Sequence, residues 1–227
     1  IREKELKYLG FIFSKEGLKL DEERLKGITD MPTPTSKEEI RRFLGMVNFV
    51  SRFIPKMSET SAPLRELLHN DKVFIWEQPQ DDSFNKLKSA LCSSPVLAYY
   101  DPAKQLILQV DSSSTGVGAC ILQDGRPIAF SSKALTQTQQ QYAQIEKECY
   151  AILFGAEKFS DYIIGNDNVI VQSDHKPLES IMKKPMMNAP PRLQRMMVQL
   201  QRYPGLKVIY TKGKDLVFAD TLSRAYD

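Results

Sequence analysis

The chain has 227 residues, of which 42% are hydrophobic and 26% are charged, so it can fill a real core as a globular protein. No apolar run approaches the roughly 20 residues that span a bilayer, and we expect no membrane partner. The three widely spaced cysteines fit buried thiols in a reducing compartment better than a disulfide or zinc framework. Because the chain begins at Ile1, we also expect it to be a piece of a longer polypeptide.

The N-terminal part of the chain predicts a short β-structure followed by helices. Residues 1–21 have the pattern of a β-hairpin, in which apolar residues surround Gly10. Farther on, Ser36 and Glu39 have the spacing of a capping box. Apolar residues then recur at helical spacing from Ile40. We therefore expect a small helical module in this part of the chain.

After a proline-containing boundary near residues 95–103, the pattern changes to strands. Five β-rich runs follow: Gln105–Asp111, Val117–Gln123, Pro127–Ser132, Val169–Asp174 and Leu206–Thr211. Helical patterns cover about 138–160, 177–183, 191–202 and 216–224. Three hairpin-linked strands and a helical crossover predict a mixed five-stranded sheet with flanking helices. The fold class is α/β, and with the preceding helical module the whole chain is α+β.

Acidic side chains stand at the ends of two predicted strands. Asp111 ends the run LILQV, and Asp174 ends the run VIVQS. Open sheets place ligand sites at the carboxyl ends of their strands, so both are candidates. A third acid, Asp220, opens the last predicted helix. It stands four residues before Arg224, a spacing that fits a surface ion pair equally well.

A fourth candidate acid lies on the long predicted helix. Glu148 is three residues after Ile145 and four before Ile152, so it shares their buried face. Glu146 lies about 200° around the helix from Glu148 and should face water. Of these two glutamates, Glu148 is therefore the candidate site residue.

The candidate site consists of carboxylates without a cysteine or histidine partner. A buried carboxylate is unfavourable unless a cation meets it. Oxygen ligands suit Mg²⁺, with Mn²⁺ also compatible, rather than zinc. A pair of such ions is suited to breaking phosphodiesters. We expect four residues to be both metal-binding and catalytic: Asp111, Glu148, Asp174 and Asp220.

A basic segment runs from residue 176 to residue 214. It holds nine basic residues and one acid, so its net charge is +8. A charge run is usually a solvated face, but the neighbouring acids favour a polyanionic substrate instead. The expected phosphate contacts are Lys176, Lys183, Lys184, Arg192 and Arg195.

Several motifs in the same order carry a resemblance to a known family. The runs YLGFIFSKEGLKLD, PTPTSKEEIRRFLGMVNFVSRFI and LKSALCSSPVL resemble the segment after the polymerase site in gypsy-type LTR-retrotransposon reverse transcriptases. The runs DSSSTGVGACILQ, IEKECYAIL, VQSDHKPL and KGKDLVFADTLSR resemble their ribonuclease H domain. The resemblance covers essentially the whole chain.

This resemblance implies a domain organisation and roles for individual residues. Residues 1–21 would be the end of the palm, with the primer grip at Leu9, Gly10 and Phe11. Residues 22–98 would be a helical thumb or connection, and residues 99–227 the ribonuclease H domain. The family's metal-binding tetrad would fall on the four candidate acids, which favours the metal interpretation of Asp220.

The implied reaction is hydrolysis of the RNA strand of an RNA/DNA hybrid with two Mg²⁺ ions. The polymerase motif Tyr-x-Asp-Asp is absent, so we expect no polymerisation by this chain alone. Tyr210 takes the place of a loop histidine that many ribonucleases H use. The implied partners are the hybrid and the remaining palm and fingers, with a homodimer left open. The implied location is intracellular, in a cytoplasmic virus-like particle or the nucleus.

Two other interpretations belong to different classes. The chain could be a catalytically silent nucleic-acid clamp or a domesticated scaffold, but degenerate copies usually lose an acid and all four are present. It could also be another ribonuclease-H-like nuclease, such as an integrase or resolvase, against which the thumb-like module argues.

Overall fold

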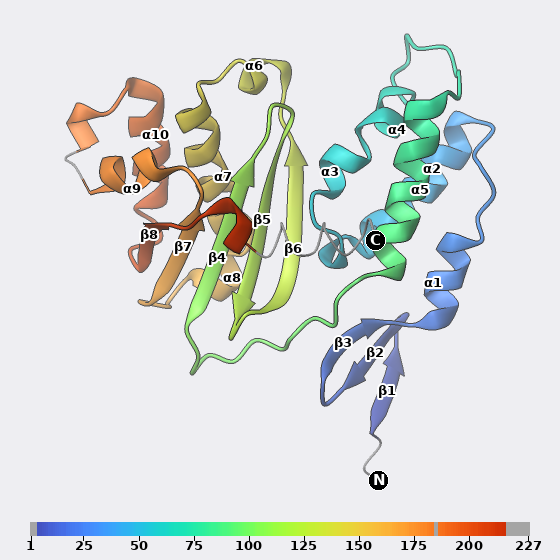
Figure 1. The fold of residues 1–227 in the computed structure, drawn as a ribbon, viewed down its shortest axis with the longest axis horizontal. Coiled ribbons are helices and arrows are strands. Elements are labelled where there is room, and N and C mark those ends of the chain that lie inside the picture. The colour runs from blue at the N-terminus through green and yellow to red at the C-terminus, as the bar shows by residue number, and fades with distance from the viewer. Residues whose placement is uncertain (1–3, 184–185, 217–227) are drawn as a thin grey trace.

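The computed structural model describes residues 4–183 and 186–216. A five-stranded sheet lies between two groups of helices, and a small three-stranded sheet lies near the N-terminus (Figure 1). Within the described ranges, no helix combines the length and apolar character needed to cross a bilayer.

The N-terminal strands form an antiparallel sheet of three: β1 (Glu5–Tyr8), β2 (Phe11–Ser14) and β3 (Gly17–Leu20). A helical module of residues 22–92 follows, with α1 (Glu22–Thr29), α2 (Lys37–Phe49), a 3₁₀ turn (Ser51–Phe53), α3 (Met57–Thr60), α4 (Ala62–Glu66) and α5 (Gln78–Cys92).

Ser36 caps α2 as predicted, because its Oγ accepts a hydrogen bond from the Glu39 amide at 3.2 Å. The Glu39 carboxylate instead accepts from the Thr35 amide, so only half of the expected capping box forms.

The larger sheet has the order β6-β5-β4-β7-β8. Its strands are β4 (Leu106–Ser112), β5 (Gly116–Gln123), β6 (Arg126–Ala134), β7 (Val169–Ser173) and β8 (Leu206–Tyr210). Strand β5 pairs antiparallel with both β4 and β6, whereas β4, β7 and β8 are parallel to one another. The prediction of a mixed five-stranded sheet with flanking helices is confirmed.

The helices between these strands are α6 (Gln137–Gln140), α7 (Gln144–Lys158), α8 (Ser160–Ile163), α9 (Lys176–Met182) and α10 (Pro191–Leu200). A 3₁₀ turn lies at Met186–Asn188, and a second one (Gly213–Asp215) follows β8. The prediction of one continuous helix over 138–160 was wrong. Ala143 has a non-helical ψ angle of 152° and is the N-cap residue of α7, a new helix. The Glu146 carboxylate accepts the Ala143 amide at 3.0 Å, which stabilises that start.

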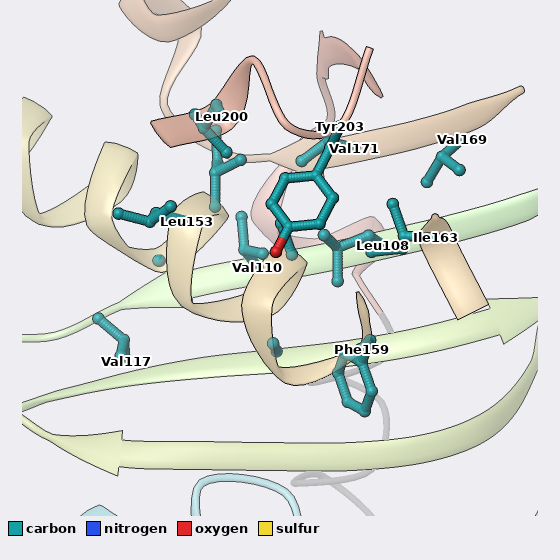
Figure 2. Close-up of a cluster of buried hydrophobic side chains, with 14 of the residues drawn as sticks. Leu108, Val110, Val117, Leu153, Phe159, Ile163, Val169, Val171, Leu200 and Tyr203 are labelled. Carbon is teal, nitrogen blue, oxygen red and sulfur yellow. The ribbon is translucent and has the colours of Figure 1, made fainter. Parts of the chain in front are cut away.

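One face of the large sheet packs against α7 and α10. Side chains from β4 and β7 meet Leu153 of α7, Leu200 of α10 and the nearby Tyr203 in this core (Figure 2). At Gly155 the helix approaches the sheet so closely that a Cβ atom would lie 3.1 Å from both Ala119 and Leu108. This close packing fixes the position of α7 over β4 and β5.

The opposite face packs against the helical module. Cys120, Leu122 and Phe130 of the sheet belong to the same buried cluster as the core of that module. A further bridge pairs Leu18 with Leu97. The helical module and the large sheet therefore share a hydrophobic core.

Candidate metal centre

Two of the candidate acids meet because their strands are neighbours. Strands β4 and β7 are parallel, and Gln109 is aligned with Gln172. Asp111 and Asp174 each lie two residues farther on, so the register brings them to the same edge of the sheet. Asp111 and Asp174 were predicted as site residues because ligand sites lie at the carboxyl ends of strands, and that prediction assumed this arrangement.

Helix α7 adds a third carboxylate. Oxygen atoms of Asp111, Glu148 and Asp174 all lie within 4.8 Å of one another, and we call these residues the carboxylate cluster. Their environments differ: Glu148 is 2% exposed, the Asp111 side chain is 20% exposed, and Asp174 is open to solvent. The cluster is therefore buried at Glu148 and accessible to solvent at Asp174.

Glu148 is held by neutral donors on one side only. Its Oε1 accepts hydrogen bonds from Ser112 Oγ at 2.7 Å and from Gln144 Nε2 at 2.8 Å. Its Oε2 is buried and has no hydrogen-bond partner among the described residues. Burial, with the charges of Asp174 and Asp111, raises the pKa of Glu148 to about 7, against the opposing hydrogen bonds.

A lysine from the helical module also reaches the cluster. The Lys56 ammonium forms an ion pair with Asp111 Oδ2, and its side chain is 23% exposed. Burial lowers the pKa of Lys56, but the hydrogen bond and charge of Asp111 outweigh burial. The charges of Glu59 and Asp174 act in the same direction, so the pKa of Lys56 is raised above its ordinary value.

Three observations show that these residues fit a divalent cation. No described residue donates to the buried Oε2 of Glu148, and an ammonium already stands beside Asp111 as a positive charge. Gly213 lies so near Asp174 that a Cβ atom would be 3.2 Å from Oδ2, so the glycine leaves room beside that carboxylate. An all-oxygen donor set of this kind suits Mg²⁺ or Mn²⁺.

The other acidic predictions have different outcomes. Asp220 lies outside the described residues. Glu146, which was expected to face water, is only 9% exposed. Its carboxylate accepts two hydrogen bonds from Arg192 Nη1, at 3.0 and 2.8 Å. That prediction was wrong because α10 packs against α7 and covers a second side of the helix.

The predicted phosphate contacts are distributed unevenly. Lys176 and Arg195 are exposed, and Lys183 is exposed but paired with Glu179 at 2.7 Å. Lys184 lies outside the described residues. Arg192 is engaged by Glu146, and its guanidinium carbon lies 4.2 Å from the ring centre of Tyr142.

Tyr210 is aligned with Ser173, the residue before Asp174, whereas the predicted primer-grip residues lie in or beside the small N-terminal sheet. Tyr210 is 39% exposed at the end of β8, and its amide donates to Glu179 at 3.2 Å. Leu9 and Gly10 form the β1–β2 turn with positive φ angles, and Leu9 is 64% exposed. Phe11 stacks against Phe49 and Phe53 of the helical module.

Three residues at the site were missed by the sequence interpretation: Lys56, Ser112 and Gln144. Gln144 stands four residues before Glu148, a helical spacing that would have indicated the contact. Ser112 directly follows Asp111 on β4. No local pattern marks Lys56, since its contact with Asp111 arises from the packing of two distant segments.

A family model and sequence relatives match this chain. Residues 76–171 match the model described as the RNase H-like domain found in reverse transcriptase. The Drosophila melanogaster Pol polyprotein from transposon opus is 35% identical over 97% of this chain and 23% of that protein. The gypsy Pol polyprotein of the same species is 32% identical over 96% of this chain and 22% of that protein. The Tf2-3 polyprotein of Schizosaccharomyces pombe is 29% identical over 98% of this chain and 17% of that protein.

Solved structures match the fold over nearly the whole chain. The foamy viral protease-reverse transcriptase in complex with RNA/DNA hybrid has a TM-score of 0.78 and 22% identity, over 93% of this chain and 30% of that one. A complex of that viral enzyme with double-stranded DNA has a TM-score of 0.78 and 23% identity, over 94% of this chain and 46% of that one. The chain spans about a fifth of the length of its curated relatives. It is a homologue of gypsy and Tf2 retrotransposon Pol polyproteins and carries the RNase H-like domain of their reverse transcriptases.

Proposed function

We propose that this chain hydrolyses the RNA strand of RNA/DNA hybrids in a reaction that depends on divalent metal. The observation that supports this most strongly is the carboxylate cluster, in which oxygens of acids on β4, on α7 and directly after β7 lie within 4.8 Å of one another. One of them, Glu148, keeps a buried oxygen to which no described residue donates. A structural ion pair would leave no such acceptor, whereas a cation site requires one.

The protein's own residues would hold the site in place. Asp111 lies on β4 and Asp174 directly follows the paired strand β7, and Ser112 and Gln144 would hold one oxygen of Glu148 in place. Two Mg²⁺ ions, when bound by these acids, supply an activated water and stabilise the leaving oxygen of the phosphodiester. Glu148 must be ionised for this role, and a bound cation favours its ionised form.

The substrate assignment rests on the family and on the basic segment. The foamy viral relative of this fold was solved with an RNA/DNA hybrid. In this chain, Lys176 and Arg195 are exposed cations on α9 and α10, available for phosphates. Such contacts make affinity fall with salt, by a slope of about 0.9 per contact in logarithmic units.

The same proposal covers the rest of the chain. Residues 1–21 would be the end of a palm, residues 22–98 a thumb or connection, and residues 99–227 the ribonuclease H domain. The remaining palm and fingers would be supplied by the longer polyprotein, of which the relatives are examples.

A cleavage assay tests the proposed activity. The purified chain is incubated with an end-labelled RNA/DNA hybrid in Mg²⁺, beside Asp174→Asn. The matched control is Asp161→Asn, which changes an exposed acid on α8. We expect the parent and the control to cut the RNA strand. Asp174→Asn should lose at least 100-fold in rate, because even residues that only support a metal ligand are worth 10- to 100-fold.

Two outcomes would contradict this proposal. Equal cleavage by Asp174→Asn and the parent would remove the carboxylate cluster from the reaction. Absence of cleavage by the parent, with hybrid binding retained, would favour the nucleic-acid clamp instead.

A further inference from the structure

The segment around Lys56 holds this residue in an unusual backbone conformation. Its φ angle is +51°, in the left-handed region that residues other than glycine rarely adopt. The residues on either side, Ile54, Pro55, Met57 and Ser58, are all buried. A strained conformation of this kind persists only when the surrounding structure over-determines it. The backbone at Lys56 is therefore fixed by its neighbours.

Contacts between α3 and the large sheet fix this segment beside the carboxylate cluster. The Ser58 amide donates to Ser132 Oγ of β6 at 2.8 Å, and Ser113 Oγ donates to Glu59. At Gly116 a Cβ atom would lie only 2.8 Å from Glu59 Cγ, so the two segments are in close contact. These contacts of the helical module thus place Lys56 beside Asp111 on β4.

The side chain of Lys56 is partly open to solvent, unlike the neighbouring residues of its segment. Its ammonium is a point charge on a flexible four-carbon stem, with an exposed fraction of 23%. The ammonium pairs with Oδ2 of Asp111, and a divalent ion bound by the cluster would approach this same carboxylate. Two cations at one carboxylate repel each other, so binding of one disfavours the other.

We propose that Lys56 is a tethered cation that competes with divalent metal for Asp111. The helical module, which carries Lys56, would thereby lower the affinity of the carboxylate cluster for metal. This inference rests on the proposed function, because it assumes that the cluster binds metal. The apparent affinity is then reduced by the fraction of molecules in which Lys56 occupies Asp111. Lys56 acts through Asp111 and is a positioning residue.

Metal affinity measures this competition without relying on activity. Mn²⁺ binding to the full chain is titrated by calorimetry or by electron paramagnetic resonance. The variants are Lys56→Met, which keeps the stem and loses the charge, and Lys56→Arg, which keeps the charge. Lys104→Met is the matched control, since Lys104 pairs with Asp124 at 2.6 Å on an exposed surface. Asp174→Asn reports binding outside the cluster.

We expect Lys56→Met to bind Mn²⁺ more tightly, on the order of tenfold, within the usual range of coupling between sites. Lys56→Arg and Lys104→Met should stay within about twofold of the parent, well inside that range. As a second readout, Mg²⁺ should increase the rate at which an amine-acylating reagent modifies Lys56, with Lys104 as the internal reference.

The possible failures are distinguishable. If the parent and Lys56→Met bind Mn²⁺ equally, or if Lys56→Met binds more weakly, the competition is refuted while the metal site stands. If Lys104→Met tightens binding as much as Lys56→Met, the effect is one of net charge and the competition is again refuted. If the parent and Asp174→Asn bind alike, the cluster is not a metal site, and the proposed function fails together with this inference.

Discussion

The two faces of the large sheet are covered by helices from different parts of the chain. One face packs against α7 and α10, which follow the first strands of the sheet, and α7 places Glu148 at the cluster. The other face packs against the helical module, which precedes the sheet and places Lys56 there. All three acids of the cluster therefore belong to the sheet and its own helix, whereas the opposing cation comes from outside. We therefore expect the packing of α7 on the sheet to determine the positions of the three acids. The packing of the helical module should determine how much of their negative charge Lys56 neutralises.

The largest expected effect concerns the core shared with the helical module. Phe130 on β6 is 3% exposed within the cluster of buried residues that includes that module. Phe130→Ala should lower the free energy of unfolding by about 3–5 kcal/mol, because it removes a large buried side chain and leaves a cavity. Urea denaturation measures the change.

The matched variant on the other face is Ile152→Ala on α7, at a residue that is 0% exposed. It should lower stability by about 2–5 kcal/mol. Comparable losses would show that both faces contribute to the fold. A loss below about 1 kcal/mol in Phe130→Ala alone, far under the usual range, would mean that the helical module is not part of the same core.

The next effect is the pH dependence of stability without divalent metal. The pKa of Glu148 is raised from 4.5 to about 7, chiefly by burial. The stability that its protonated form contributes is fully present below pH 4.5 and is lost as the pH rises through about 7. Glu148→Gln should therefore stabilise the chain at pH 8 in a chelator by on the order of 3 kcal/mol.

Thermal unfolding between pH 4.5 and pH 8 measures this effect, with Glu157→Gln on the exposed side of α7 as the control. The control should keep the pH dependence of the parent. If Glu148→Gln kept it too, Glu148 would not be the group that titrates.

The smallest expected effect concerns the ion pair between Glu146 and Arg192. Their side chains are 12% and 45% exposed, and partly exposed pairs contribute little. Arg192→Ala should cost about 1 kcal/mol, since it also removes the contact with Tyr142. Arg195→Ala, on the exposed side of α10, should cost less than about 0.5 kcal/mol. Chemical denaturation of Arg192→Ala and Arg195→Ala measures the two losses of stability. Equal losses would contradict a specific contribution of the ion pair between Glu146 and Arg192.

Much of the fold and part of the site could be predicted from the sequence because the signals are local. Alternating and helical patterns predicted the mixed sheet, and strand ends predicted Asp111 and Asp174. Helical spacing predicted that Glu148 is buried. In each case the information lies within a few residues of the position concerned.

The remaining features depend on packing between distant segments. Glu146 was expected in solvent because helical spacing contains no information about Arg192, which lies 46 residues farther along the chain and contacts Glu146. The break at Ala143 depends on a carboxylate that turns back to the chain rather than on periodicity. Lys56 meets Asp111 only because α3 docks on the sheet. Patterns along the chain cannot reveal such contacts.

The most direct test is the position of a bound metal. Crystals of the chain soaked in Mn²⁺ should show an anomalous scattering peak bound by oxygens of Asp111, Glu148 and Asp174, with the Lys56 ammonium moved off Asp111. Distances near the roughly 2.1 Å expected for Mg²⁺ ligands would identify direct coordination. Manganese bound elsewhere, with the cluster empty and Lys56 still on Asp111, would contradict the assignment of these three acids as the metal centre.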